Sequence, residues 1–378
     1  MAAAESGLLP AERRIGAKAP RDSSFELLRI VLMLLIITRH ALNYSGFEGM
    51  PLLLANRTLW RYAAGWGQTG VAGFVLITGY FSCTSKAALP DLKKIARFAL
   101  QVLFYSIAFL LALGVTGVVP LEEISLRPVQ FLLPFTQTEY WFATYYLLLL
   151  LIAPFLNAAI ERLGQKRHLA LVLILFTVFS LIPSFLKVKY TSDRLVIFVL
   201  LYLLAAYCRL YAPPLFEKRW FAPALIAAGS LWIIYYRILL ASLLPHIPRL
   251  AFLVNRSVGR VYDVPVLLFA LGLFLLFRKL RVKSSRVINL VASGTFGVYL
   301  FHEHPLCRRF LWLRLFHAAD YAESPRLLPY LAWVIALVFV TGIAIDLARQ
   351  YALEKPLFRL IEGVWGKLKQ RKKVTADP

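Results

Sequence analysis

Two ionisable residues, Arg29 and His40, stand inside a long apolar run, residues 26–40 (ELLRIVLMLLIITRH). Its composition is that of a transmembrane helix. Eleven positions separate the two, so at about 100° per residue they lie within about 20° of one helix face, about 16 Å apart along the axis. A guanidinium binds anionic groups, and a neutral imidazole can accept a proton from a hydroxyl near neutral pH. The pair therefore predicts an anion-binding group and a general base at two depths of one helix.

Each of the two residues also has a simpler explanation. A charge inside a membrane costs about 2.5–3.5 kcal/mol on insertion scales, so such groups usually face a protein interior or a water-filled cavity. Arg29 could instead be an interfacial residue that reaches the lipid headgroups, and His40 could make one satisfied hydrogen bond to another helix. The spacing alone does not decide between these interpretations.

The arrangement of Arg, ten residues and His in a first membrane helix resembles the signature of membrane-bound acyltransferase family 3. Four further stretches follow in the family's order and extend the resemblance over most of the chain: residues 70–81 (GVAGFVLITGYF), 140–142 (YWF), 154–157 (PFLN) and 294–302 (GTFGVYLFH). Thr78 stands where many members have Ser. We expect no extracellular hydrolase-like domain of the kind that some longer members carry.

The resemblance implies an O-acyltransferase. The donor would be acetyl-CoA or another acyl-CoA on the cytoplasmic side, used as a substrate, with no permanently bound cofactor. The acceptor would be a hydroxyl of a cell-surface polysaccharide or of its lipid-linked glycan precursor. We expect a multi-pass protein of the plasma membrane that contacts membrane lipids and binds no nucleic acid.

Each candidate residue has an expected role. His40 would be the catalytic base, and Arg29, about 16 Å away along the helix, would bind the donor. Thr78 could stabilise an oxyanion, and Thr78 with Gly79 could expose backbone amides to the donor, although the glycines of this span also suit close helix packing. Five residues are candidates for the acceptor side: Glu139, Tyr140, Trp141, His302 and Glu303. The aromatic pair equally suits a membrane-interface belt.

Composition excludes a soluble protein. Hydrophobic residues make up 60% of the chain and the mean hydropathy is +0.67, so the fold class is an all-α, polytopic membrane bundle. The net charge of +23 comes from short clusters between apolar runs, which indicates topology and argues against a nucleic-acid surface. His302 and His304 could suggest zinc, but no further ligand follows at a closing distance. The three cysteines form no metal spacing: Cys83, Cys208 and Cys307.

Apolar runs of helix length predict about ten spans, and an even number places both termini on one side. The spans are residues 25–44, 67–84, 95–119, 140–160, 168–186, 195–211, 220–244, 261–277, 287–301 and 328–351. The terminal side carries about twice as many Lys and Arg as the other, which predicts cytoplasmic termini. We expect a tail at 1–24, a membrane domain at 25–352 and a basic tail at 353–378.

A second class of function fits the intramembrane charges as well. In a transporter or flippase for a glycan precursor or another polar solute, Arg29 and His40 would line a permeation path without covalent chemistry. The chain shows no convincing pair of interrupted spans in two matching halves, the trace expected of many transporters. A purely structural scaffold is the third alternative.

Overall fold

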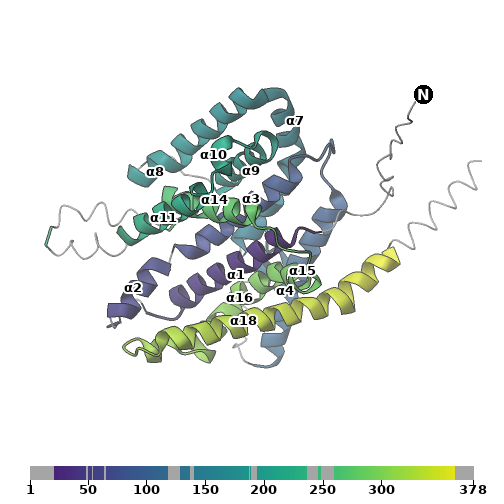
Figure 1. The fold of residues 1–378 in the computed structure, drawn as a ribbon. Helices are drawn as coiled ribbons and strands as arrows, with labels where there is room; N and C mark the ends of the chain where they lie inside the picture. The colour runs from purple at the N-terminus through teal and green to yellow at the C-terminus, as the bar shows by residue number, and fades with distance from the viewer. Residues whose placement is uncertain are drawn as a thin grey trace, which may run out of the picture.

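The computed structural model describes residues 21–47, 50–52, 54–63, 65–117, 128–136, 140–186, 188, 194–235, 246–247 and 259–361 of the 378-residue chain. Every regular element in these ranges is helical (Figure 1), which confirms the all-α class. The longer helices are α1 (Ser23–Tyr44), α2 (Leu54–Ala63), α3 (Trp66–Ser82), α4 (Leu92–Val115), α7 (Trp141–Phe176), α9 (Arg194–Tyr211), α11 (Phe221–Ile234), α14 (Val264–Lys279), α15 (Arg286–Ser293), α16 (Thr295–Glu303) and α18 (Leu327–Arg349). Among the shorter ones, α17 is Pro305–Arg309 and η6 is Gln350–Glu354.

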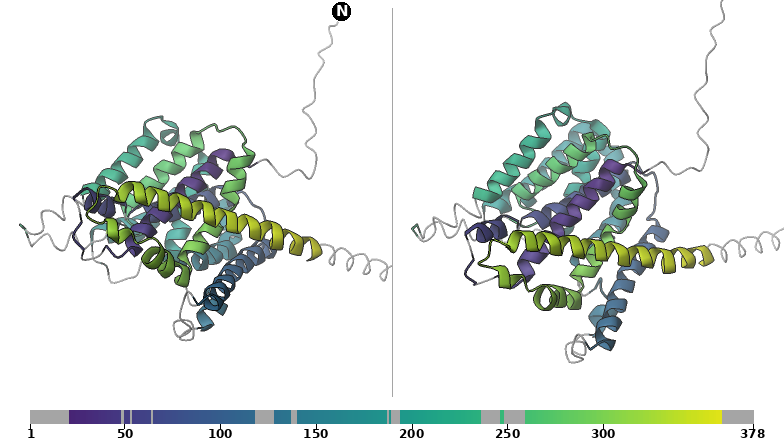
Figure 2. Two further views of the ribbon diagram at one scale, coloured as in Figure 1. Left: turned by 90° about the horizontal axis from the view of Figure 1, so that it is seen from below. Right: turned by 60° about the horizontal axis from the view of Figure 1, so that its bottom comes forward.

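The helix that carries Arg29 and His40, α1, lies in the middle of the bundle. It packs against α3 and α14 on one side and against α15, α16 and α18 on the other (Figure 1, Figure 2). Asp22 caps it by accepting a hydrogen bond of 2.9 Å from the backbone N–H of Ser24. The core face of α1 carries fully buried Leu28 and Leu32 at helical spacing. The apolar side of α1 therefore fixes where its polar residues point.

Glycines bring α3 close to α1. A Cβ at Gly70 would lie 2.6 Å from the carbonyl oxygen of Leu32, and one at Gly73 would lie 2.6 Å from the Leu32 side chain. Small residues let membrane helices approach at backbone distance. Gly70 and Gly73 thus set the separation of α1 and α3, the two helices that border the candidate site.

We expect Gly70→Val to destabilise the protein because its side chain would collide with backbone that cannot move aside. Overpacking of this kind costs about 1–3 kcal/mol, measurable as a lower Tm of the detergent-solubilised protein. Ala112→Val, at an exposed position of α4, is the control. Equal Tm values for the two variants would show that α1 and α3 tolerate a wider separation.

The predicted count of about ten spans is not confirmed. By length and composition, four helices of the described ranges could cross a membrane: Leu92–Val115, Trp141–Phe185, Arg194–Tyr211 and Leu327–Ile361. The predicted spans 140–160 and 168–186 follow each other in one long helical segment with no loop between them. This segment is kinked at Gly164, where φ is 67°. The predicted span 287–301 is divided at Gly294 between α15 and α16. Helix α3 has only 17 residues, and α1 carries Glu26, Arg29 and Arg39 within its apolar run.

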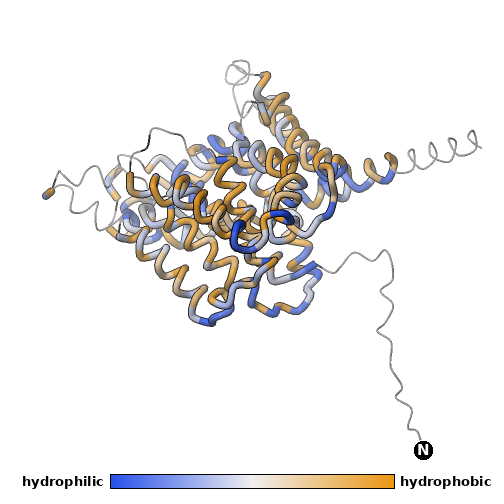
Figure 3. The backbone as a smooth tube through the Cα atoms, turned by 90° about the horizontal axis from the view of Figure 1, so that it is seen from above, coloured by the Kyte–Doolittle hydropathy of each residue, from blue (hydrophilic) through white to orange (hydrophobic). Residues whose placement is uncertain are grey.

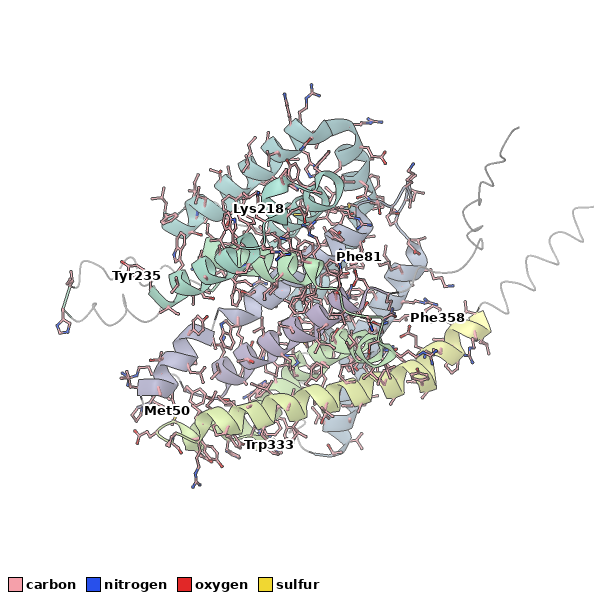
Figure 4. All side chains as sticks on the ribbon, viewed as in Figure 1. Met50, Phe81, Lys218, Tyr235, Trp333 and Phe358 are labelled. Atoms are coloured by element: carbon pink, nitrogen blue, oxygen red, sulfur yellow. The ribbon has the colours of Figure 1, made fainter. Side chains whose placement is uncertain are left out.

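Large apolar side chains remain exposed along the outer helices, as expected where lipid replaces water. Leu111, Phe155 and Trp333 are 59%, 58% and 56% exposed, and Trp333 lies on the outer side of α18 (Figure 4). Figure 3 shows hydrophobic residues along the helices and hydrophilic ones at many of the turns. The structure therefore agrees with a membrane protein.

The start of α1 and the end of α18 lie at the same end of the bundle because both contact α15. Ser23 Oγ donates to Asn289 Oδ1 at 3.0 Å, and Gln350 Nε2 donates to the Ser293 carbonyl at 3.2 Å. This agrees with an even number of crossings. Their cytoplasmic location stays a prediction, and the tails at 1–20 and 362–378 lie outside the described residues.

Candidate active site

Two histidines from different helices meet at the centre of the candidate site. Nδ1 of His40, on α1, lies 2.9 Å from Nε2 of His302, on α16. Nδ1 of His302 lies 2.6 Å from the Val298 carbonyl oxygen, which can only accept, so this nitrogen carries the proton of a neutral His302. Nε2 of His302 is then an acceptor, and His40 must donate to it through Nδ1–H. The chain of bonds leaves Nε2 of His40 with a free lone pair, as a general base requires.

A buried carboxylate stands beside this pair. Glu303 Oε1 lies 3.2 Å from His40 Nδ1 without a hydrogen bond of its own, because the Nδ1 proton points to His302. Glu303 Oε2 is 3.8 Å from Arg308 Nη1. The Arg308 guanidinium lies 4.7 Å from the centre of the Tyr44 ring, which packs against His40 at 5.5 Å. The carboxylate of Glu303, and not the Arg308 cation, can stabilise an imidazolium that forms when His40 takes a proton.

The second histidine of the His-x-His sequence points elsewhere. Nε2 of His304 lies 3.2 Å from the Ser106 carbonyl oxygen, and its ring stacks on Phe131. His302 and His304 therefore do not converge on one ligand position. Within the described ranges, no group of three His, Cys, Asp or Glu side chains could hold a metal ion.

A cavity of about 220 Å³ lies along the face of α1 that carries Arg29 and His40. Arg29, Met33 and Ile36 line it from α1, and Phe296 and Tyr299 line it from α16. The helical spacing of residues 29, 33, 36 and 40 places His40 one turn beyond the end of this row. On α16, Tyr299 likewise precedes His302 by one turn. The cavity therefore extends from Arg29 toward the histidine pair.

The polar groups of the cavity are only partly satisfied by one another. Arg29 keeps 34% of its side chain exposed and lies 3.8 Å from Glu26, while its buried Nε makes no hydrogen bond to the described residues. Thr78 Oγ1 lies 3.0 Å from the hydroxyl of Tyr146, and both residues line the cavity. A cation with spare donor capacity and two hydroxyls thus face one apolar space.

Gly79 does not line this cavity. A Cβ at Gly79 would lie 2.8 Å from the Cα and carbonyl oxygen of Tyr202 on α9. The structure therefore places this glycine at a close helix contact, the alternative that its sequence context left open. Its neighbour Thr78 lines the cavity.

The two aromatic candidates for the acceptor side, Tyr140 and Trp141, lie in different environments. Tyr140 is buried and donates to the Leu300 carbonyl at 3.1 Å. Trp141 receives the guanidinium of Arg194 at 4.4 Å from its ring centre. Glu139 lies outside the described residues. Tyr140 consequently braces α16, the helix of His302, and has no free face for a sugar.

A buried polar network was not anticipated from the sequence. Asp346, which is fully buried on α18, accepts hydrogen bonds from Gln101 and Tyr105 at 3.0 Å, from Arg349 at 2.8 Å and from Gln350 at 2.7 Å. Gln101 also lines the cavity. The sequence did carry one signal of this network: an Asp and an Arg stand three positions apart at the end of the last apolar run. Residues at this spacing lie on one helix face and can form an ion pair.

The same network explains a glycine of the 294–302 stretch. A Cβ at Gly297 would lie 2.3 Å from the carboxyl carbon of Asp346. Only a residue without a side chain lets α16 approach α18 at this depth. The position of His302 on α16 therefore depends on the Asp346 network.

Comparison with known proteins assigns the chain to a family. Residues 22–349 match the family model of acyltransferase family 3, described as an acyltransferase domain. No curated protein and no solved structure matches the chain. The matched region begins one residue before α1, ends at the last residue of α18 and includes both members of the Arg29 and His40 pair. The chain belongs to the membrane-bound acyltransferases of family 3.

Proposed function

We propose that the protein transfers an acyl group, in the simplest case acetyl, from acyl-CoA to a hydroxyl of a cell-surface polysaccharide or its lipid-linked glycan precursor. The observation that carries the proposal is the cavity that Arg29 lines and that extends along α1 and α16 toward the His40 and His302 pair. A donor whose charged part stays near Arg29 would have to extend about 16 Å to bring its thioester to His40. The pantetheine arm of CoA has a comparable reach.

The proposed reaction uses His40 in both proton transfers. Nε2 of His40 accepts the proton of the acceptor hydroxyl while the hydroxyl oxygen attacks the thioester carbonyl. The tetrahedral intermediate then expels the CoA sulfur, which takes the proton back from the imidazolium. His302 holds the His40 ring through the 2.9 Å contact, and Glu303, 3.2 Å away, offsets the transient positive charge. The products are the O-acyl ester and free CoA.

On the donor side, the guanidinium of Arg29 would bind the phosphates of CoA. Arg29 is partly exposed, and its Nε, 3.8 Å from Glu26, makes no hydrogen bond to the described residues, so the guanidinium keeps donors for this contact. The hydroxyls of Thr78 and Tyr146 would contact the arm that lies in the cavity.

On the acceptor side, His302 and Glu303 act through His40 because they are almost fully buried, with 0% and 3% exposure. The exposed part of Arg308, with 33% of its side chain accessible, is a charged group that an entering glycan would meet. Trp141 remains a candidate for contact with a sugar ring. We expect this end of the bundle to face the outside of the plasma membrane.

Replacing Arg29 by lysine tests the donor site. Lysine keeps the charge but loses the planar fork that grips two phosphate oxygens, so we expect donor affinity to fall on the order of tenfold. Calorimetry with acetyl-CoA and the detergent-solubilised protein measures the loss. Arg162→Lys, at an exposed position of α7, should bind like the wild type. No binding of any short-chain acyl-CoA to folded wild-type protein would favour a transporter.

The acceptor class is tested in cells. Acyl groups on surface glycans are compared between cells with the wild-type protein, with His40→Ala and without the protein. We expect O-acyl esters only with the wild type. Identical acylation in all three kinds of cell would show that surface glycans are not the acceptor. It would not contradict the proposed donor site.

A further inference from the structure

A second cavity lies on the outside of the bundle, between α4 and the C-terminal part of α18 with η6. Its volume is about 480 Å³, and Leu100, Phe104 and Leu111 line its α4 wall. Leu353 and Leu357 line the opposite wall. Figure 2 shows α4 beside the C-terminal half of α18. The groove is apolar over most of its length, and the leucines on its two walls are partly exposed.

One end of the groove carries a cation, Arg97. The Arg97 guanidinium carbon lies 4.3 Å from the ring centre of Phe358, and the buried Nε of Arg97 makes no hydrogen bond to the described residues. Within the part of the chain that the structure describes, no carboxylate pairs with Arg97. The neighbouring charges are already paired, because Arg349 binds both Asp346 at 2.8 Å and Glu354 at 2.6 Å. The groove therefore presents one uncompensated positive charge.

The groove is long enough for a lipid chain. Arg97 and Leu111 are fourteen residues apart on α4, which corresponds to about 21 Å along the helix axis. One leaflet contributes about 15 Å of hydrocarbon. An acyl chain can therefore lie along the groove while its headgroup stays at Arg97.

We propose that this groove is a binding site for an anionic phospholipid, whose phosphate contacts Arg97 and one of whose acyl chains fills the space between α4 and η6. A cation next to an apolar slot matches the two parts of such a lipid. The aromatic face of Phe358 holds the guanidinium in place. Arg97 lies at the end of the bundle where Phe358 follows α18, so the bound lipid belongs to the leaflet on the side of both termini. The site does not depend on the acyl-transfer proposal.

Native mass spectrometry of the detergent-solubilised protein tests the site. The protein is titrated with phosphatidylglycerol and, separately, with phosphatidylcholine of the same chains. We expect preferential retention of one phosphatidylglycerol by the wild type. Arg97→Gln should weaken this retention about fivefold, the effect of one basic residue near a membrane surface. Arg162→Gln, an exposed arginine of α7, should retain phosphatidylglycerol like the wild type.

A second variant tests the apolar part without changing charge. Ala108 lines the groove, so Ala108→Phe should exclude the acyl chain and reduce phosphatidylglycerol retention while Arg97 is intact. Circular dichroism and size-exclusion chromatography confirm that each variant is folded, and Arg97→Met, which also removes the charge, replaces Arg97→Gln if the latter is not. Equal retention by Arg97→Gln and Arg162→Gln, or unchanged retention by Ala108→Phe, would overturn the proposal. Equal retention of the two lipids by the wild type would overturn it as well.

Discussion

Replacing His40 by alanine lowers the rate of acyl transfer about 10²-fold or more, because general-base catalysis contributes this much when one positioned group supplies it. Donor binding should persist, since Arg29 lies about 16 Å away along α1. The rate is measured as acceptor-dependent release of free CoA thiol, and donor affinity is measured by calorimetry. A variant that kept near-normal transfer while folded would reduce His40 to a packing residue.

His302→Ala is the matched test of how His40 is held. This variant removes the acceptor of the Nδ1 proton but leaves the imidazole of His40 in place. We expect a smaller loss of rate than for His40→Ala, with little change in donor affinity. His302→Gln offers a side-chain oxygen that can accept the same proton, so it should recover part of the rate. Equal losses for His302→Ala and His40→Ala would mean that the two imidazoles act as one unit.

Replacing Asp346 by alanine destabilises the fold on the order of 3 kcal/mol, the effect of removing one partner of a buried ion pair. The substitution leaves buried Arg349 with only Glu354 and strips the acceptor from Gln101 and Tyr105. Urea titration and the Tm of the detergent-solubilised protein measure the loss. Donor binding per folded molecule should fall as well, because Gln101 lines the donor cavity.

Two further variants separate charge from space. Asp346→Asn keeps the shape but gives up the negative charge, so its stability should lie between those of the wild type and Asp346→Ala. Asp320→Ala, an exposed position, should leave the Tm unchanged. If Asp346→Ala matched Asp320→Ala, the network would be unnecessary for the packing of α16 on α18.

The most specific prediction from the sequence concerned α1. Helical periodicity alone placed Arg29 and His40 on one face, and the structure places a cavity along that face. Helix positions were also predictable from apolar runs, since residues 195–211 coincide closely with α9. These features could be predicted because they depend only on the spacing of residues within one segment of the chain.

Features that depend on contacts between distant segments were not predictable. The bond between His40 and His302 joins residues 262 positions apart, and the Asp346 network joins α18 to α4. The role of Tyr140 could not be predicted from the sequence either, because an aromatic residue beside a membrane helix can equally well face a ligand or the core. The span count depended on assuming that every apolar run crosses once, whereas Gly294 divides one run into two short helices.

One reconstitution measures the central claim directly. Purified protein is placed in lipid vesicles. Acetyl-CoA with a labelled acetyl group is supplied on the side of the membrane where both termini lie, and a lipid-linked glycan acceptor is supplied on the other side. We predict that the label becomes covalently attached to the glycan with the wild type and not with His40→Ala, while the released CoA remains on the donor side. Movement of unacylated glycan across the vesicle membrane, with no label attached to it, would contradict the account and identify a flippase.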